Sequence, residues 1–281
     1  MPNTLLSLGH GYSARALSKR LLREGWRVIG TTRSEEKAEA IRATGAEALI
    51  WPGADLSEAL TSATHLLLSA GPEEGGDPFL RHAPEVTQAD VTWAGYLSTT
   101  GVYGDRQGGW VDETDACNPA TWRGQARLDA ERGWAETGLP LHIFRLAGIY
   151  GPGRGPFAKV RAGTARQIIK PGQVFSRIHV EDIASVLEAS IAPPNTGALY
   201  KVCDNEPAPP QDVRAHPARL LGLPPPPEVD FETAEMTEMA RSFYAESKKV
   251  SNARIREELG VRLLYPSYRD GLAALKDLPN G

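Results

Sequence analysis

The sequence predicts an α/β fold, in which a doubly wound parallel sheet is joined to a smaller C-terminal lobe. The chain starts with a short apolar run at residues 5–8, then a glycine-containing turn, then apolar residues at helical spacing. Short, continuous apolar runs recur at 46–51 and 65–69, as expected for strands that are buried on both faces of a parallel sheet. Strand and helix patterns alternate through the first third of the chain, which favours the doubly wound arrangement.

Composition places the chain among soluble globular proteins. Its 281 residues are 41% hydrophobic and 23% charged, and they suffice for one large core or for one large and one small domain. The 31 basic and 35 acidic side chains give a formal net charge of -4, without blocks of like charge. We therefore expect no nucleic-acid partner.

The N-terminus lacks the features of a signal peptide, and no apolar run is long enough to span a membrane. The two cysteines, Cys117 and Cys203, do not have the spacing of metal ligands and would remain thiols in a reducing compartment. We expect a cytoplasmic protein with no metal site and no membrane partner.

The first turn carries a candidate nucleotide-binding motif. Gly9, Gly11 and Ala14 fit the spacing G-x-G-x-x-G/A directly after a predicted strand. Gly9 would allow a sharp turn, Gly11 a close approach of the backbone to a pyrophosphate, and Ala14 tight packing of the helix on the strand. The helix N-terminus at Tyr12 and Ser13 would then face the anion. The alternative is a strand-to-helix turn that binds no ligand.

The second strand, residues 27–33, suggests which cofactor is bound. In dinucleotide-binding folds a carboxylate at the end of this strand binds the 2′-hydroxyl of the adenosine ribose, whereas an arginine accommodates a 2′-phosphate. Here the strand ends at Thr32 and Arg33, and the first acid is Glu35, in the helix that Ser34 would cap. We therefore expect NADP rather than NAD, with NAD as the alternative; Arg33 would otherwise be a solvated loop cation.

The next candidate contacts follow the strand at 65–69. Ser69 and Gly71 would lie at the carboxyl end of this strand, which is the edge where doubly wound sheets bind ligands. The glycine-rich, acidic segment 71–78 is expected to form a loop near the cofactor.

Five motifs later in the chain point to one family. They occur in the order of that family and resemble the extended short-chain dehydrogenases/reductases, the NAD-dependent epimerase/dehydratase family. The resemblance implies a Rossmann domain, expected over residues 1–148, and a smaller substrate lobe over 149–281, with segments that return to the first domain. It also implies an oxidoreductase or epimerase acting on a small hydroxyl or carbonyl compound, and it suggests a homodimer. The motifs are LSTTGVYGD (97–105), NP (118–119), RLDAE (127–131), FRLAGIYGPG (144–153) and RIHVEDIA (177–184).

The catalytic positions of this family are altered here. The family uses a Tyr-x-x-x-Lys pair together with a Ser or Thr, and its motifs place Thr99 at the Ser/Thr, Arg127 at the Lys and Arg123 at the Tyr. The window 118–131 contains neither Tyr nor Lys. The chain thus resembles the atypical, YeeZ-like branch of the family. Arg127 would act as a fixed cation near the nicotinamide ribose, whereas Arg123 stays protonated and cannot serve as a general base.

A proton carrier would then come from elsewhere in the chain. Tyr103 and Tyr150 are candidates because each follows a predicted strand, although a tyrosine in VYG or IYG also packs and hydrogen-bonds within a loop. His179 between two apolar residues is more typical of a core histidine. Arg154 and Lys159 are candidate anion contacts in the lobe, with plain surface cations as the alternative.

Two functions are therefore expected. The first is an NAD(P)-dependent oxidoreductase or epimerase with an atypical active site. The second is a non-catalytic NAD(P)-binding sensor or regulatory protein, which the missing Tyr and Lys favour. Nucleotide-sugar enzymes of the family often carry an arginine where this chain has Phe175, so such a substrate is not expected.

Overall fold

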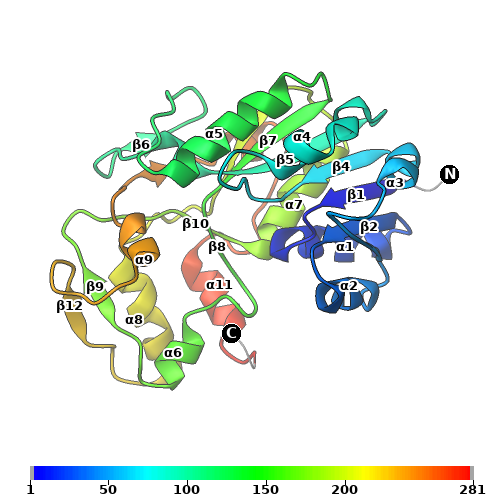
Figure 1. Ribbon diagram of the computed structural model, residues 1–281. Helices are drawn as coiled ribbons and strands as arrows, with labels where there is room; N and C mark the ends of the chain where they lie inside the picture. Colours follow the sequence, from blue (N-terminus) through cyan, green and yellow to red (C-terminus); the bar gives the residue numbers. More distant parts are fainter. Residues whose placement is uncertain (1–2, 279–281) are drawn as a thin grey trace. The chain divides into compact units, whose positions relative to one another are not determined.

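The computed structural model describes residues 3–278 and contains a seven-stranded parallel sheet (Figure 1). The strand order is β11-β7-β5-β4-β1-β2-β3. This order reverses direction beside β1, which creates the switch point where doubly wound sheets bind ligands. The predicted fold class is confirmed. The strands are β1 (Thr4–Leu8), β2 (Arg27–Thr32), β3 (Glu47–Ile50), β4 (His65–Leu68), β5 (Trp93–Thr99), β7 (Leu141–Leu146) and β11 (Leu199–Val202).

Contacts divide the chain into two compact units. The first unit contains the residues up to Thr99 together with Trp122–Arg145 and Ile183–Tyr200. The second unit contains Thr100–Thr121, Leu146–Asp182 and the residues from Lys201 onward. Each unit thus combines segments that are far apart in the sequence.

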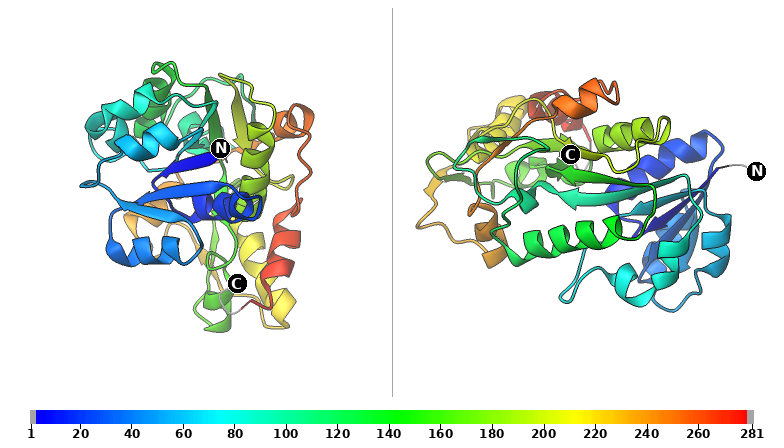
Figure 2. Two further views of the ribbon diagram at one scale, coloured as in Figure 1. Left: turned by 90° about the vertical axis from the view of Figure 1, so that its right-hand side faces the viewer. Right: turned by 90° about the horizontal axis from the view of Figure 1, so that it is seen from above.

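Helices cover both faces of the sheet in the first unit (Figure 2). On one face, Arg20 of α1 donates a hydrogen bond of 2.8 Å to Ser185 of α7. On the other face α4 and α5 meet, since a Cβ added at Gly133 would lie 2.8 Å from Leu80. The helices associated with this unit are α1 (Tyr12–Arg23), α2 (Glu35–Arg42), α3 (Ser57–Ser62), α4 (Pro78–His82), η1 (Pro84–Gln88), α5 (Trp122–Ala135) and α7 (Val180–Ile191).

The core of the first unit is built by the apolar strand runs. Leu6 of β1 and Leu66 of β4 are fully buried, as the continuous apolar pattern predicts for strands covered on both faces. Aromatic side chains close the core, because Trp51 stacks on Phe79 with ring centroids 4.1 Å apart. The indole of Trp134 donates to Asp77, the residue that caps α4.

The second unit has three short parallel strand pairs and several short helices. A small core of aromatic and aliphatic side chains, among them Tyr150, Phe157 and Tyr268, joins β8, α6, α8 and α11. The strand pairs are β8 (Gly148–Tyr150) with β10 (Arg177–His179), β9 (Gln167–Ile169) with β12 (Glu228–Asp230), and β6 (Trp110–Val111) with β13 (Lys249–Val250). The helices are η2 (Thr100–Tyr103), α6 (Phe157–Arg161), α8 (Pro210–Leu221), α9 (Glu238–Phe243), α10 (Ala253–Glu257) and α11 (Tyr268–Leu275).

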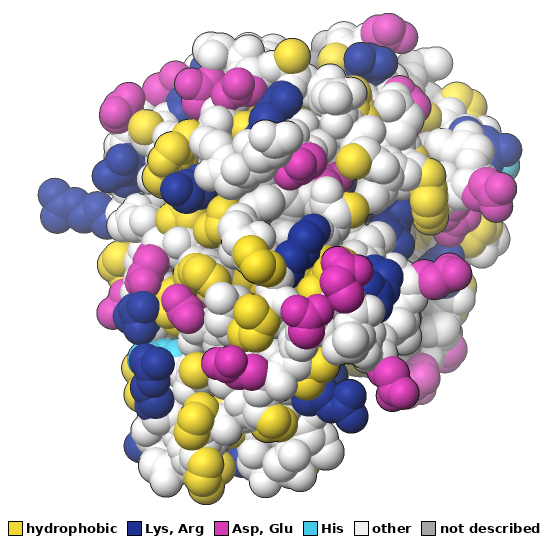
Figure 3. Space-filling model, turned by 90° about the vertical axis from the view of Figure 1, so that its left-hand side faces the viewer, with side chains coloured by type: hydrophobic (Ala, Val, Ile, Leu, Met, Phe, Trp, Pro, Cys, Tyr) yellow, Lys and Arg dark blue, Asp and Glu magenta, His cyan; other side chains and the backbone are white. Residues whose placement is uncertain are grey.

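The surface mixes charges of both signs. On the face drawn in Figure 3, basic and acidic side chains are interspersed, with hydrophobic side chains between them. Over residues 3–278, no helix has both the length and the hydropathy that crossing a membrane requires.

Candidate functional site

The glycine loop after β1 is fixed by the ends of two neighbouring strands. Gly9 has φ +82°, and a Cβ at this position would lie 2.6 Å from the backbone nitrogen of Ala70, so no other residue fits. The N–H of Gly9 donates to the Thr31 hydroxyl at 2.8 Å, and the N–H of His10 donates to the Thr31 carbonyl at 2.8 Å. The Ser69 hydroxyl donates to the Gly9 carbonyl. The tight turn that the sequence predicts is therefore held from β2 and from the end of β4.

The N-terminus of α1 has the features of an anion site. Gly11 precedes the helix and is exposed, and the nearest neighbour of an added Cβ would be the Gly9 carbonyl at 3.8 Å. The helix has no side-chain cap and no acidic residue in its first turn, which begins at Tyr12. Ser13 and Ala14 are buried, so the helix packs closely on the sheet. Backbone N–H groups and the positive end of the helix dipole at such a position suit a pyrophosphate, so these residues fit a dinucleotide.

A buried histidine underlies the loop. His10 is 7% exposed, and neither ring nitrogen has a hydrogen-bond partner within residues 3–278. Burial lowers the pKa of His10 to about 4, with Arg15 acting in the same direction, so the imidazole is neutral at physiological pH. Its ring occupies the space that a Cβ at Gly30 would need, 2.6 Å from His10 Cγ. The sequence analysis missed this pairing of Gly30 in β2 with the loop.

The end of β2 carries the residues expected to select the cofactor. The Thr32 carbonyl accepts a hydrogen bond from the N–H of Trp51 at 2.8 Å. Arg33 forms an ion pair of 2.8 Å with Glu73, and the two side chains are 76% and 58% exposed. Glu73 is bridged to Gly76 within the acidic segment that follows Gly71. Arg33, which is predicted to bind a 2′-phosphate, thus forms a solvent-exposed ion pair with the Glu73 carboxylate.

Arg127 joins α5 to the ends of β4 and β5. Its Nη1 donates to the Leu97 carbonyl at 2.6 Å, to the Tyr96 hydroxyl at 3.3 Å and to the Ala70 carbonyl at 3.4 Å. A Cβ at Gly71 would lie 3.3 Å from Arg127 Nη2. Because Ala70 also contacts the glycine loop, the guanidinium lies at the same edge of the sheet as the candidate cofactor residues. Thr99, the last residue of β5, is half-buried.

A buried ion pair holds α5 in place four residues beyond Arg127. Arg145 Nη2 lies 2.7 Å from Glu131, and the two side chains are 6% and 4% exposed. Arg145 Nε also donates to this carboxylate at 3.0 Å, and the Ser98 hydroxyl donates to it from β5. Because these bonds tie α5 to β5 and β7, they fix the position of Arg127.

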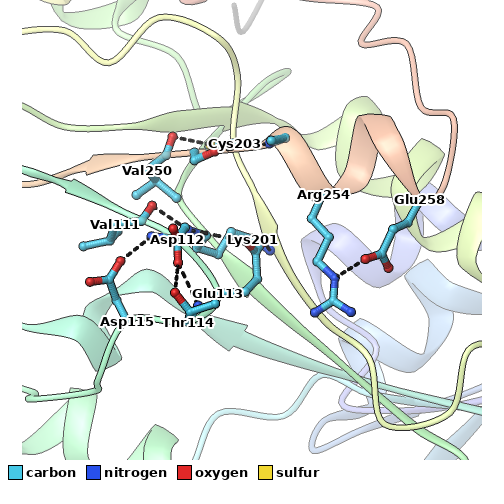
Figure 4. A network of polar contacts seen from close by, with 12 residues as sticks. Val111, Asp112, Glu113, Thr114, Asp115, Lys201, Cys203, Val250, Arg254 and Glu258 are labelled. Atoms are coloured by element: carbon cyan, nitrogen blue, oxygen red, sulfur yellow. Dashed lines mark hydrogen bonds and ion pairs between the residues drawn. The ribbon is translucent and has the colours of Figure 1, made fainter.

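Eleven of the twelve predicted site residues lie in the first unit, whereas Tyr103 lies in the second. Tyr103 is fully buried, with the Lys201 ammonium 5.7 Å from its ring centroid. Lys201 is itself fully buried; its Nζ donates to the Val111 carbonyl and lies 3.7 Å from Glu113 (Figure 4). Burial lowers the pKa of Lys201, although the acidic side chains around it act in the opposite direction.

Two further candidate proton carriers pack against each other in the second unit. The rings of Tyr150 and His179 meet edge to face, with centroids 5.2 Å apart. Burial raises the pKa of Tyr150 and lowers that of His179 to about 4. His179 Nδ1 accepts from the N–H of Glu181 at 3.2 Å. Neither side chain has a pKa near neutrality, which favours the packing interpretation for both.

The second unit contains a pocket of about 380 Å³. Of the two candidate anion contacts, Arg154 lines it, whereas Lys159 is exposed and is not among the lining residues. Arg177 and Arg214 also line it, together with the aromatic side chains of Phe175, Tyr244 and Tyr268. Arg214 was not predicted, because nothing in its local sequence distinguishes it from a surface cation of an amphipathic helix.

Comparison with known proteins identifies relatives along nearly the whole chain, although no family model matches it. The chain is 30% identical over 280 residues to the protein YeeZ of Escherichia coli K12, covering 92% of this chain and 95% of YeeZ. It is 33% identical over 177 residues to a 3-diazoavenalumate denitrifying reductase from a Streptomyces species, covering 58% of this chain and 55% of the reductase.

Solved structures agree with the fold. A functionally unknown conserved protein from Silicibacter pomeroyi DSS is 59% identical, with a TM-score of 0.92 over 98% of both chains. Bifidobacterium longum UDP-glucose 4-epimerase, solved with NAD+ and UDP, is 19% identical with a TM-score of 0.73, covering 99% of this chain and 100% of the epimerase. The human epimerase family protein SDR39U1, solved with NADPH, is 15% identical with a TM-score of 0.74, covering 98% of this chain and 99% of that protein.

The near-complete alignment with YeeZ agrees with the order of the sequence motifs and with the glycine loop at the switch point of the sheet. The chain therefore belongs to the NAD-dependent epimerase/dehydratase family of extended short-chain dehydrogenases/reductases, in its YeeZ-like branch.

Proposed function

We propose that the protein is an NADP-dependent oxidoreductase or epimerase-type enzyme that acts on a small hydroxyl or carbonyl compound. The glycine loop carries this proposal. Gly9 turns with a positive φ where Ala70 leaves no room for a side chain, and the uncapped N-terminus of α1 follows it at the switch point of the sheet. A reductase among the relatives, and structural neighbours solved with NAD+ or NADPH, support the same chemistry.

The cofactor would be held by residues of the first unit. Gly9, Gly11 and the first turn of α1 would bind the pyrophosphate, because this turn has no side-chain cap of its own. Thr32 and Arg33 would contact the adenosine ribose and its 2′-phosphate, while Ser69 and Gly71 would border the site after β4. A bound nicotinamide supplies hydride exchange with the substrate carbon.

The chain's own residues would orient and polarise the substrate. The Thr99 hydroxyl would hold the substrate oxygen at the end of β5. Arg127 would supply a fixed positive charge near the nicotinamide ribose, but a guanidinium stays protonated and cannot exchange a proton near neutral pH. Tyr103 is the proposed proton carrier. Because its side chain is fully buried, this role requires that substrate binding expose its hydroxyl.

One observation favours a second function, that of a non-catalytic NADP sensor. The Arg127 guanidinium already donates to the Leu97 and Ala70 carbonyls and to the Tyr96 hydroxyl, so it serves as a structural link between α5 and two strands. Burial raises the pKa of Tyr96 to about 12, despite the neighbouring arginine, so this phenol does not exchange a proton near neutrality. A sensor needs the cofactor site but no proton carrier.

Calorimetric titration with NADP+, NADPH, NAD+ and NADH, at one fixed salt concentration, tests the shared basis of both functions. Gly11→Asp would place a carboxylate at the start of α1 without a clash, because the nearest neighbour of a new Cβ is 3.8 Å away. We expect this variant to lose binding of all four nucleotides. Asn3→Asp adds the same charge at an exposed position before β1 and serves as the matched control. Unchanged binding by Gly11→Asp would refute the proposed cofactor site.

Turnover separates the two functions. An oxidoreductase should change the nicotinamide absorbance with some alcohol or carbonyl compound. An epimerase should invert a substrate centre without a net absorbance change, whereas a sensor should bind NADP without either kind of turnover. Sedimentation of the purified chain would test the homodimer that we also propose from the family resemblance.

A further inference from the structure

The pocket of the second unit holds positive charge that the protein neutralises only in part. Arg177 donates to the carbonyls of Phe175 at 3.0 Å and Ala208 at 3.3 Å, and both of these acceptors are uncharged. Within residues 3–278, neither Arg177 nor Arg214 forms an ion pair with a carboxylate. A partly buried guanidinium without a counter-charge is costly, so this arrangement suits an anionic ligand.

Asp204, a buried acid beside Arg177, neutralises the positive charge of the pocket only in part. The N–H of Asp204 donates to the Arg177 carbonyl at 2.6 Å, which places this buried residue beside the arginine. Burial raises the pKa of Asp204 to about 7, and its Oδ2 has no hydrogen-bond partner within residues 3–278. Burial lowers the pKa of Arg177 only to about 10, so the guanidinium remains charged while the carboxyl is partly protonated at neutral pH.

Aromatic rings form the walls of the same pocket. Phe175 and Tyr244 meet edge to face, with centroids 5.7 Å apart, and the Arg177 guanidinium lies 5.8 Å from the Phe175 ring. Tyr268 is fully buried, and its hydroxyl has no hydrogen-bond partner within the described residues. A pocket of about 380 Å³ with such walls suits a planar aromatic ring.

The backbone favours a carboxylate over a phosphate. Phosphate sites commonly use N–H groups at helix N-termini. Of the helices that begin at this pocket, α11 is capped by Ser267 in a capping box, and α8 and α6 have a proline at or directly before their first residue. Pro210 is the first residue of α8, and Pro156 precedes α6, so each removes one donor. The guanidinium forks of Arg177 and Arg214 remain, and their planar geometry matches a carboxylate.

We propose that this pocket binds an aryl carboxylate, with Arg177 and Arg214 as the carboxylate contacts and Phe175, Tyr244 and Tyr268 as the ring contacts. Naming this compound the substrate rests on the proposed function, whereas its binding to the pocket does not.

Binding of cinnamate to the full chain, by calorimetry without nicotinamide nucleotide, tests the proposal. We expect cinnamate to bind at least about tenfold more tightly than uncharged cinnamamide. Arg177→Gln and Arg214→Gln should each weaken the binding of cinnamate at least about tenfold. Arg166 is an exposed arginine of the same unit that does not line the pocket, so the control variant Arg166→Gln should weaken this binding less than about twofold. Equal binding of cinnamate and cinnamamide, or equal effects of the three variants, would overturn the proposal.

Two further comparisons keep the result unambiguous. Tighter binding of phenyl phosphate or UMP than of cinnamate would also overturn the proposal, because the pocket would then be a phosphate site.

If Arg177→Gln does not fold, Arg214→Gln and the comparison of cinnamate with cinnamamide still test the proposal. Binding of cinnamate without NADP binding would refute the proposed function and leave the pocket assignment standing, and NADP binding without cinnamate binding would do the reverse.

Discussion

Replacing Arg33 by alanine should weaken NADP and spare NAD. The arginine forms an ion pair with Glu73 at 2.8 Å, and both side chains are largely exposed. To bind a 2′-phosphate it must give up this pair, which in solvent contributes about 0–1 kcal/mol. A charge-assisted contact to phosphate contributes about 1.5–3 kcal/mol. The net loss in Arg33→Ala is therefore about 0.5–3 kcal/mol, or roughly 2–160-fold in the Kd for NADP.

The same geometry predicts the opposite effect for Glu73→Gln. This change removes the carboxylate that competes for Arg33 and that repels a phosphate nearby. NADP should bind about 0.2–1 kcal/mol more tightly, with little change for NAD. The gain should shrink as salt is raised, because both charges are exposed.

Calorimetric titration of wild type, both single variants and the double variant completes the cycle. If Glu73 acts by holding Arg33, then adding Glu73→Gln to Arg33→Ala should have almost no further effect. Equal weakening of NADP and NAD by Arg33→Ala would show that the arginine does not read the 2′-phosphate. Weaker NADP binding by Glu73→Gln would refute the inference that Glu73 competes with the 2′-phosphate for Arg33.

Three further changes test the catalytic, structural and electrostatic parts of the account. Thr99→Val should lower turnover roughly 10–100-fold with little change in NADP affinity, because it removes one hydrogen bond to the transition state. Unchanged turnover would exclude the role of Thr99 in holding the substrate oxygen. Glu131→Ala removes the carboxylate of the buried ion pair with Arg145 and should lower the free energy of unfolding in urea by about 3–5 kcal/mol. Asp129→Ala, which removes the exposed ion pair with Arg132, should lower it by only about 0–1 kcal/mol. Burial raises the pKa of Asp204 to about 7 in the folded protein, so its contribution to stability is present below its unfolded pKa and is lost as pH rises to about 7. Asp204→Asn should therefore gain stability relative to wild type between pH 4 and 7 in thermal scans, and parallel pH profiles would contradict this.

The fold of the first unit could be predicted because its signals are local. Continuous apolar runs such as residues 5–8 and 65–68 mark strands that are buried on both faces, and all of their leucines are at most 3% exposed. The spacing of Gly9, Gly11 and Ala14 carries its own mechanical reason, and Gly9 has the positive φ that the tight turn requires. For elements that pack along their whole length, the strand and helix bounds predicted from the sequence agree with those of the structure to within a few residues.

The second unit was less predictable because its elements are short and its pairings are distant. β6 pairs with β13, and β9 with β12, between segments far apart in the chain. The segment 231–244 is helical only at Glu238–Phe243, and Phe243 is 60% exposed. The pocket is assembled from five such segments, so the approach of Arg214 to Arg177 has no local sequence signature.

In the proposed enzyme, Arg127 would limit the reactions that the first unit could support on its own. Hydride transfer to a carbonyl leaves a negative oxygen, which a guanidinium stabilises through its charge. Completing the reduction needs a proton, and a group that remains protonated throughout the functional pH range can neither give one up nor recover it. The proton must then come from water or from a side chain such as Tyr103 in the second unit, whereas a sensor needs neither source. Tight NADP binding alone therefore does not distinguish the two functions, whereas turnover does.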